Sequence, residues 1–296
     1  MRPIVFHFPD DKPLARTIVE SSGAELGTLQ WHRFPDGESL ITLHGECANR
    51  DVIIVCTLNN ADAKALPLHF FATTARELGA RRVGLIAPYL AYMRQDARFH
   101  PGQSRSAYGY AEFISTTFDW LITVDPHLHR IDSLDAIFSI PTVTVSAMPA
   151  VSEWLRANVA DPVLIGPDRE SAQWTERAAR ELGCPCVVLD KVRHGDRHVE
   201  VSTPDPALIR GRTPILIDDI ASSGQTMIEA LKGLRTVGVR DVICVAVHGL
   251  FADGAEAGLR EAGAARIVST NTVPHASNAI DIGPSVASAL ERFMAR

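Results

Sequence analysis

The feature that most constrains the fold is a repeat, because the second half of the chain restates the pattern of the first. The segments IVFHFPD and VLIGPD (residues 4–10 and 163–168) are both apolar runs that end in Pro-Asp. Each is followed, in the same order, by a helical pattern ending in Leu-Gly, a strand–charged loop–strand segment, another apolar run and a Gly-x-Arg-x-Val segment. Chance could supply one such match, but four in order predict two similar α/β domains from an internal duplication.

Within each half, short apolar runs alternate with longer helical patterns, which is typical of a mainly parallel sheet flanked by helices. In the first half, strands are expected at residues 4–8, 29–34, 39–43, 51–56 and 82–87, and helices at 12–26 and within 59–78. The boundary is expected near residues 145–150, before a new helix. We therefore predict a first domain at residues 1–146, joined by a C-terminal helix at 284–296, and a second domain at 147–283.

The stretch PILIDDIASSGQTM (residues 214–227) carries the clearest functional signal. Its apolar run predicts a buried strand that ends in Asp218 and Asp219, followed by small hydroxylated residues and a helical pattern. Free N–H groups and the helix dipole at a helix N-terminus can hold a phosphate. The carboxylates would repel that phosphate, so we expect them to face sugar hydroxyls or a phosphate-bound metal. The simpler alternative is a helix capped by Ser222 or Ser223, although two carboxylates beside a buried strand are costly unless something binds them.

The matching position of the first half, CTLNN (residues 56–60), lacks both the acidic pair and the small-residue loop. One domain thus keeps a predicted sugar-phosphate site, and the other is free for a different role. A chain with two such domains fits an enzyme that handles two phosphorylated substrates.

Composition excludes several classes of function. A net charge of −6 argues against a nucleic-acid surface, for which a basic stripe would be expected. No apolar run approaches the ~18–20 residues that a membrane span needs, and the N-terminal apolar run is too short for a signal peptide. Five cysteines, an odd number, favour reduced thiols in the cytoplasm over a disulfide framework.

Two segments of the first half place polar side chains after predicted strands, where open α/β sheets bind ligands. In residues 89–99, Arg94 and Arg98 could grip phosphate oxygens and Gln95 could hydrogen-bond a base or a phosphate; a solvated loop is the alternative. His127 could bind Mg²⁺ or act on a leaving group, although a lone histidine is more often structural.

Two segments of the second half carry comparable signals. Asp168 follows a strand and could hold a metal ion or cap a helix. Lys191 and Arg193 lie on one face of an extended segment, with a turn expected at residues 195–196. Two cations at the tip of a hairpin suit closure over developing phosphoryl charge, and a solvated surface hairpin is the alternative.

Residues 214–227 resemble the phosphoribosyl-diphosphate (PRPP) binding loop shared by type I phosphoribosyltransferases and PRPP synthetases. Together, the segments above resemble the ribose-phosphate diphosphokinase (PRPP synthetase) family along nearly the whole chain, and residues 96–107 are similar to its shorter members. The matching motifs are FPDGE (34–38), YMRQD (92–96), VDPH (124–127), PD (167–168), DKVR (190–193), and DD (218–219) with SSGQT (222–226).

The resemblance implies an enzyme that transfers the β,γ-diphosphoryl group of ATP to the C1 hydroxyl of ribose 5-phosphate, with Mg²⁺ as cofactor. It also implies a homo-oligomer in which the Phe34 loop reaches an active site across a subunit interface. The residues it implies are Phe34, Asp36, Gly37, Glu38, Arg94, Gln95, Asp96 and His127 for ATP; His127 and Asp168 for the metal; Lys191 and Arg193 for catalysis; and Asp218, Asp219, Ser222, Ser223, Gly224, Gln225 and Thr226 for ribose 5-phosphate.

Three departures from the family pattern stand out. Ser222 replaces a usual Asp, and Gln225 replaces a usual Gly, so the Gln225 side chain is expected to point outward. Arg169-Glu170 replaces small residues after Asp168. The stretch GQSRS (residues 102–106) is also unusual for the family, so its classical activation by phosphate and inhibition by ADP are not carried over to this chain. The alternatives are a phosphoribosyltransferase that uses PRPP, which has no use for the DGE, RQD and DKVR elements, and a catalytically silent regulatory homologue, which would be expected to have lost a cation or a metal residue.

Overall fold

The computed structural model describes residues 1–189, 191–194, 198–201 and 206–295, and gives the backbone alone at 173, 191–194, 198–201, 206 and 207. The chain divides into two compact units. One comprises Met1–Ser146 with Ile282–Arg296, and the other comprises Ala147–Asp281.

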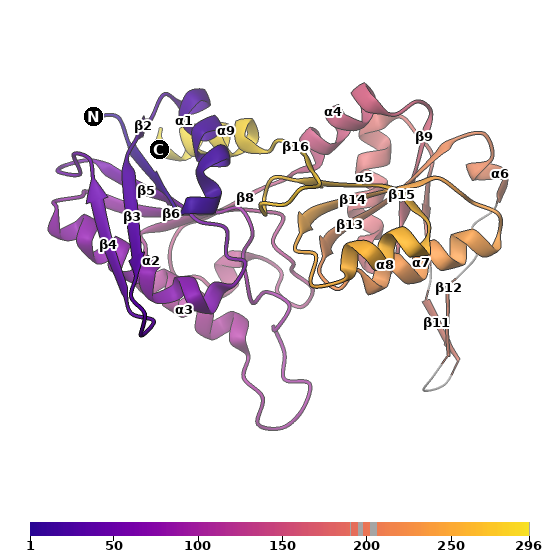
Figure 1. Ribbon diagram of the computed structural model, residues 1–296, viewed down its shortest axis with the longest axis horizontal. Coiled ribbons are helices and arrows are strands. Elements are labelled where there is room, and N and C mark those ends of the chain that lie inside the picture. Colours follow the sequence, from indigo (N-terminus) through magenta and orange to yellow (C-terminus); the bar gives the residue numbers. More distant parts are fainter. Residues whose placement is uncertain (190, 195–197, 202–205, 296) are drawn as a thin grey trace. The chain divides into compact units, whose positions relative to one another are not determined.

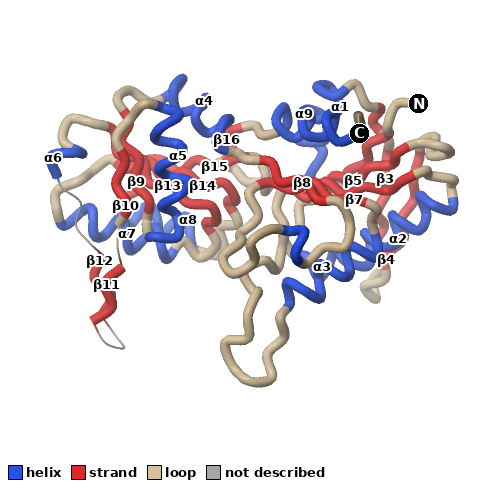
Figure 2. Tube along the Cα trace, turned by 180° about the vertical axis from the view of Figure 1, so that it is seen from behind, coloured by secondary structure: helices blue, strands red, loops and turns tan. Residues whose placement is uncertain are grey.

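A six-stranded parallel sheet forms the centre of the first unit, in the order β2-β1-β5-β6-β7-β8. Its strands are β1 (Ile4–His7), β2 (Glu25–Leu26), β5 (Asp51–Val55), β6 (Arg82–Ala87), β7 (Trp120–Val124) and β8 (Thr142–Val145). A separate antiparallel hairpin consists of β3 (Thr28–Arg33) and β4 (Ser39–His44). Helices α1 (Lys12–Ser22) and α9 (Gly283–Met294) cover one face of the sheet, and α2 (Ala61–Glu77) and α3 (Ser106–Thr117) cover the other (Figures 1 and 2).

The second unit repeats this architecture. Its parallel sheet has the order β10-β9-β13-β14-β15-β16, with strands β9 (Pro162–Gly166), β10 (Cys186–Val188), β13 (Thr213–Ala221), β14 (Val242–Gly249), β15 (Ala264–Thr270) and β16 (Asn278–Ile280). Strands β11 (Lys191–His194) and β12 (His198–Val201) form an antiparallel pair. Helices α4 (Met148–Asn158) and α5 (Ala172–Leu182) lie on one face, and α7 (Gln225–Thr236) and α8 (Ala255–Ala262) lie on the other (Figure 1).

Short helical segments complete the fold: η1 (Pro9–Asp11) and η2 (Leu134–Ala136) in the first unit, and η3 (Arg169–Ser171) and α6 (Pro206–Ile209) in the second. Each strand of the first sheet corresponds to the strand eight places later in the second, and each unit has its hairpin at the same point of the chain. The prediction of two similar parallel α/β domains is therefore confirmed. Strands β5 and β7 are buried throughout, as expected for a sheet covered on both faces.

The predicted helix at residues 12–26 is too long. Helix α1 ends at Ser22 because Gly23 adopts a left-handed conformation (φ 65°) and its N–H donates to the Val19 carbonyl. The next residues then form β2, which pairs with β1. Gly183, which ends α5 at φ 69°, is thus the counterpart of Gly23, and the Leu-Gly at residues 26–27 is not a helix end.

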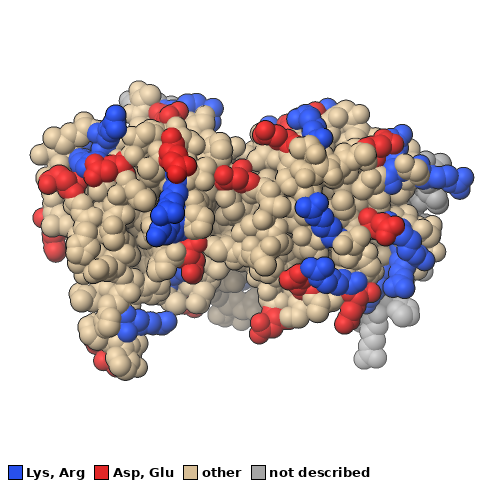
Figure 3. All heavy atoms as spheres, turned by 45° about the horizontal axis from the view of Figure 1, so that its top comes forward, with Lys and Arg blue, Asp and Glu red and all other residues tan. Residues whose placement is uncertain are grey.

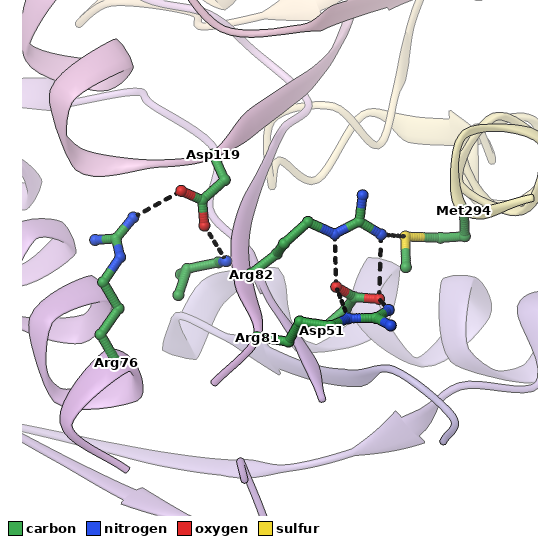
Figure 4. A network of polar contacts seen from close by, with 7 residues as sticks. Asp51, Arg76, Arg81, Arg82, Asp119 and Met294 are labelled. Carbon is green, nitrogen blue, oxygen red and sulfur yellow. Dashed lines mark hydrogen bonds and ion pairs between the residues drawn. The ribbon is translucent and has the colours of Figure 1, made fainter. Parts of the chain in front are cut away.

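A charged network lies where β5 and β6 begin (Figure 4). The side chain of Asp51 is 3% exposed and accepts hydrogen bonds from Arg81 and Arg82. Burial alone would raise the pKa of the Asp51 carboxyl, but the hydrogen bonds and charges of Arg82 and Arg81 hold that pKa below its usual value. Nearby, Asp119 accepts from the backbone of β6 at 2.6 Å and from Arg76 Nη2 at 3.2 Å. Buried charge at this end of the first sheet is therefore matched by protein partners.

On the face drawn in Figure 3, the described basic and acidic side chains are interspersed, and no continuous basic stripe crosses it. In the part of the chain that the structure describes, no helix has both the length and the hydropathy to cross a bilayer.

Candidate functional site

The acidic pair lies near the carboxyl end of β13, between β9 and β14. The strand does not end at Asp218 and Asp219 as predicted, but continues to Ala221, because its last two residues pair with the end of β14. Both aspartates are partly exposed, and the Asp219 N–H donates to Asp218 Oδ1 at 3.1 Å. The two carboxylates thus stand at the carboxyl edge of the sheet, where open α/β sheets bind ligands.

The small-residue loop that follows leads directly into α7. Gly224 is the N-cap residue of the helix, and its φ of 70° is a left-handed conformation that favours glycine. The loop is held by the neighbouring segment, since the Ala252 N–H donates to the Ser222 carbonyl at 2.9 Å. Ser223 Oγ accepts from the Gln225 N–H at 3.4 Å. The serine cap considered above is therefore present in part, although Ser223 is not the N-cap residue.

Gln225 points away from the loop, as predicted. Its side chain is exposed, and its Nε2 donates to Glu229 Oε1 at 3.1 Å, one turn further along α7. The larger side chain therefore does not fill the space above the loop backbone.

Asp168 follows β9 and caps the helical segment η3. Its Oδ1 accepts from the N–H groups of Glu170 (3.1 Å) and Ser171 (3.3 Å), and the Ser171 hydroxyl donates to the Asp168 carbonyl at 2.6 Å. This capping box is the structural alternative raised for Asp168. It fixes the carboxylate at the strand end, and a metal-binding role stays a prediction.

The Asp36-Gly37-Glu38 segment forms the tip of the β3–β4 hairpin. Asp36 Oδ1 accepts from the Glu38 N–H at 3.2 Å, and Gly37 takes φ 94°. The Phe34 side chain is 40% exposed and packs edge-on against His32 at 4.5 Å between ring centroids. Between this tip and α2 lies a cleft of about 430 Å³, lined in part by Glu38.

The YMRQD motif lies in the loop between β6 and α3. Arg94 and Gln95 are exposed, as ligand-contacting side chains would be. Asp96 differs from them, because its side chain is 2% exposed and pairs with Arg130 at 3.0 Å. Sequence reasoning missed Arg130, although a buried aspartate in a polar loop implies a cationic partner.

His127 lies in the loop after β7 and is partly exposed. Its ring packs edge-on against that of His129, with 3.9 Å between centroids. His127 belongs to the first unit and Asp168 to the second.

The backbone of Lys191 and Arg193 lies in β11, which pairs with β12 in register 191 to 201. The expected strands on either side of the turn are present. The turn itself, at residues 195–196, and the side chains of Lys191 and Arg193 lie outside the described part of the structure.

The first unit has a counterpart of the small-residue loop between β5 and α2, and there a lysine is buried. Lys64 is 7% exposed, and its ammonium donates to the Thr57 carbonyl at 2.6 Å and to Asn59 Oδ1 at 2.7 Å. Asp11 Oδ1 accepts from the Thr57 N–H at 3.1 Å. Burial raises the pKa of Asp11 to about 6, although the Lys64 charge opposes that rise. A lysine one turn into a helix gave no sequence signal for this cluster.

The same two-domain organisation appears in comparisons with known proteins. Residues 4–117 match the family model for the N-terminal domain of ribose phosphate pyrophosphokinase, and residues 134–285 match that for the phosphoribosyl transferase domain. A ribose-phosphate pyrophosphokinase from Methanopyrus kandleri is 33% identical over 292 residues, which cover 98% of this chain and 99% of the relative. The chain belongs to the ribose-phosphate pyrophosphokinase family.

Other relatives agree. A ribose-phosphate pyrophosphokinase from Methanobrevibacter smithii is 31% identical over 289 residues, covering 94% of this chain and 96% of the relative. Among solved structures, the phosphoribosylpyrophosphate synthetase from Mycobacterium smegmatis superposes with a TM-score of 0.85 over 100% of this chain and 99% of the other, at 23% identity. This likeness confirms the fold, and the family assignment confirms the resemblance found in the motifs.

Proposed function

We propose that this chain is a ribose-phosphate diphosphokinase, which transfers the β,γ-diphosphoryl group of ATP to the C1 hydroxyl of ribose 5-phosphate and releases AMP. The observation that carries the proposal is the acidic pair at the carboxyl edge of the second sheet, followed by a small-residue loop at the start of α7. Family membership over nearly the whole chain supports it.

Ribose 5-phosphate binds, in this proposal, across the β13–α7 junction. Asp218 and Asp219 accept hydrogen bonds from the ribose hydroxyls. Ser222 to Thr226 hold the 5-phosphate, because hydroxyls, backbone N–H groups and the positive end of a helix dipole favour an anion there. Gln225 contributes its backbone, since its side chain is bonded to Glu229.

ATP is bound by groups of the first domain. Phe34, Asp36, Gly37 and Glu38 on the hairpin tip contact adenine, and Arg94, Gln95 and His127 contact the rest of the nucleotide. The exposure of Arg94 and Gln95 in the loop after β6, and the place of His127 in the loop after the neighbouring strand β7, support this assignment. Asp96 was also predicted to contact ATP, but its burial and its pair with Arg130 favour a different role.

Mg²⁺ fits this donor set as a metal carried by the substrate phosphates. The described residues contain no group of three or more His, Cys, Asp or Glu side chains that could hold a metal ion. Mg²⁺ commonly keeps waters and binds one or two carboxylates together with phosphates. Asp168 and His127 are the residues that would hold it, and when bound it would neutralise charge on the β- and γ-phosphates.

Catalysis in this proposal depends on positioning and on cations. The C1 hydroxyl oxygen attacks the β-phosphorus in line and its proton passes to solvent; a new O–P bond forms, and the bond between the β-phosphorus and the AMP oxygen breaks. Lys191 and Arg193 stabilise the negative charge that develops on the transferred group and on the departing AMP.

We further propose a homo-oligomer. Two exposed apolar side chains of α2, Leu66 (63%) and Phe70 (38%), line the cleft beside Glu38, and two more are exposed on the β3–β4 hairpin, Phe34 (40%) and Leu40 (52%). Single exposed apolar residues are normal on a protein surface, but several close together favour contact with another protein chain, here a second copy. The molecular mass of the protein in solution tests whether it forms an oligomer.

A cytoplasmic location agrees with five cysteines that form no disulfide.

The test is to incubate the protein with ATP and Mg²⁺, with and without ribose 5-phosphate, and to follow AMP release and the product by phosphorus NMR. AMP formed only with the sugar, together with a new diphosphate ester, is the expected result. ADP in place of AMP would mean an ordinary kinase, and nucleotide binding without turnover would favour a regulatory homologue. PRPP consumption with a base but no synthesis would favour a phosphoribosyltransferase.

Lys191→Ala tests the catalytic cation. The variant should lose at least ~10²-fold in kcat with little change in KM, because the contact is made mainly in the transition state. Lys232→Ala, which removes an exposed lysine from α7, is the matched control. A variant at position 191 with unchanged kcat would contradict the role.

A further inference from the structure

Asp96 is a buried carboxylate in a loop whose basic side chains are exposed to solvent. In the sequence Met93-Arg94-Gln95-Asp96 the first and last residues are buried, and the two residues between them are exposed. The loop therefore turns two anchors inward and presents Arg94 and Gln95 outward. A carboxylate in this position is costly unless it is paired.

Arg130 supplies that pair in two ways. Its Nη1 donates to Asp96 Oδ1 at 3.0 Å, and its backbone N–H donates to Asp96 Oδ2 at 3.2 Å. The guanidinium also lies 5.5 Å from the centre of the Phe99 ring. Both carboxylate oxygens of Asp96 thus accept hydrogen bonds from Arg130, which lies in another loop. Arg130 also contacts Phe99, a second residue of the Asp96 loop.

The pair joins two loops that leave neighbouring strands. Asp96 follows β6, and Arg130 follows β7, three residues after His127; the two strands are parallel and pair from Gly84 to Ala87. The residue before Asp96 is also tied to the helix that follows the loop, because the Gln95 carbonyl accepts from the Ala107 N–H, in the first turn of α3, at 3.2 Å.

We propose that Asp96 and Arg130 form a positioning latch, which holds Arg94 and Gln95 on one loop in register with His127 on the other for binding the nucleotide. Asp96 acts through this latch and does not touch the ligand. The proposal rests on the proposed function, in that it takes these three side chains to be ATP contacts.

The test compares Asp96→Asn, Arg130→Met, Arg130→Lys and the double variant Asp96→Asn/Arg130→Met. Asn keeps the size of Asp and removes its charge, and because position 96 is buried, any effect on ATP cannot come from a lost ligand contact. The measurements are kcat, KM for each substrate, and the dissociation constant of a non-hydrolysable ATP analogue, with thermal unfolding to verify the fold.

Arg76→Met is the matched control. Arg76 also donates to an aspartate, Asp119, that accepts a backbone N–H as well, but this pair lies where β6 begins, at the end of the strand opposite the proposed site (Figure 4). This variant also removes a guanidinium from an aspartate that accepts a backbone N–H, although the Asp119 side chain is 40% exposed and that of Asp96 is 2% exposed. Its KM values should stay within about twofold of wild type.

We expect Asp96→Asn and Arg130→Met each to raise KM for ATP and the dissociation constant of the analogue about tenfold. KM for ribose 5-phosphate should change less than twofold. Arg130→Lys should recover part of the loss. The double variant should be no worse than the weaker-binding single variant, because both changes break one pair.

Additive losses in the double variant would overturn the latch, since they would mean that Arg130 binds ATP independently of Asp96. Equal rises in KM for both substrates would also overturn the latch. So would a rise in KM for ATP in Arg76→Met as large as that in Arg130→Met. If Arg130→Met does not fold, Arg130→Lys and Asp96→Asn decide alone: an unchanged analogue affinity in both overturns the proposal. A wild-type protein that binds the analogue without making PRPP would overturn the proposed function, while the analogue affinities still judge the latch.

Discussion

The loops after β5 and after β13 occupy the same place in two matching domains, yet they carry opposite charge arrangements. Each leads from a buried strand into a helix whose N-cap residue is left-handed, Asn60 at φ 56° and Gly224 at φ 70°. In the second domain the loop follows two aspartates and has small side chains. In the first, the buried ammonium of Lys64 binds the loop's own Thr57 carbonyl and Asn59 side chain.

The comparison teaches how one backbone serves two purposes. The loop that we propose to receive a phosphate has small side chains, whereas the first loop is closed by the ammonium of Lys64 from its own helix. Asp11 also stabilises the first loop, because its carboxylate accepts a hydrogen bond from the Thr57 N–H at 3.1 Å and interacts electrostatically with Lys64. The first domain therefore needs other segments, on the hairpin and after β6 and β7, for its proposed nucleotide role.

The largest effect should come from removing the acidic pair. Asp218→Asn/Asp219→Asn should lower kcat/KM for ribose 5-phosphate about 10³-fold, because hydrogen bonds to charged groups contribute about 1.5–3 kcal/mol each. Steady-state kinetics measure it, and Asp241→Asn, outside the loop in the same domain, is the control. A kcat/KM within threefold of wild type would contradict the proposed role of the acidic pair in binding the sugar. The difference in sequence between the two loops would then not reflect a difference in ligand binding.

The sequence predicted the parallel sheets and the repeat, because apolar runs and Pro-Asp ends are local signals, whereas the roles of the candidate site segments stay predictions. It placed the end of α1 wrongly, since the Leu-Gly pair was more prominent than Gly23, and it ended β13 too early, since charged residues rarely continue a strand. The repeat could have corrected the first error, because Gly183 ends α5 in the same way.

Contacts between distant segments were beyond the sequence. Nothing in the spacing of Asp96 and Arg130 indicates that they pair, because their contact depends on two loops meeting beside neighbouring strands. Lys64 gave no signal either, since a helical lysine is usually exposed and only the fold shows that it turns inward. Side chains that act within one segment were thus predictable, and side chains that join segments were not.

Removing the Lys64 ammonium, which binds the first loop, should have the next largest effect. Lys64→Met should lower the free energy of unfolding by about 3 kcal/mol, because it leaves the Thr57 carbonyl and the Asp11 carboxyl buried without their cation. KM for ribose 5-phosphate should stay within about twofold. Denaturant titration and kinetics measure the two quantities, with Lys12→Met, an exposed lysine of α1, as control. A large rise in that KM with an intact fold would mean that the first loop binds the sugar phosphate.

Asp11→Asn should change how stability depends on pH. Burial raises the pKa of Asp11 from 3.8 to about 6, so between pH 4 and 6 the folded state binds more protons than the unfolded state, and stability falls as pH rises. The difference between the pKa of Asp11 in the folded state and its usual value corresponds to at most about 3 kcal/mol of unfolding free energy. The stability of the variant relative to wild type should therefore increase by about 2–3 kcal/mol from pH 4 to pH 8. Thermal or denaturant unfolding across this range measures it, with Asp10→Asn controlling for loss of one negative charge; a flat difference would contradict the burial of an ionised Asp11.

The smallest expected effects come from substitutions of Asn60 and Gly224, the two N-cap residues with a left-handed backbone conformation. Gly224→Ala and Asn60→Ala should each cost about 1 kcal/mol of stability, because both place alanine at a positive φ. A methyl group at Gly224 would meet only ordinary contacts, 3.5 Å from Leu259 Cγ, so strain in the backbone accounts for the cost. Only Gly224→Ala should also raise KM for ribose 5-phosphate, by about three- to tenfold, because only its loop has to receive an anion. Equal KM values in the two variants would mean that the left-handed residue serves the helix start alone in both domains, and that the phosphate is held elsewhere.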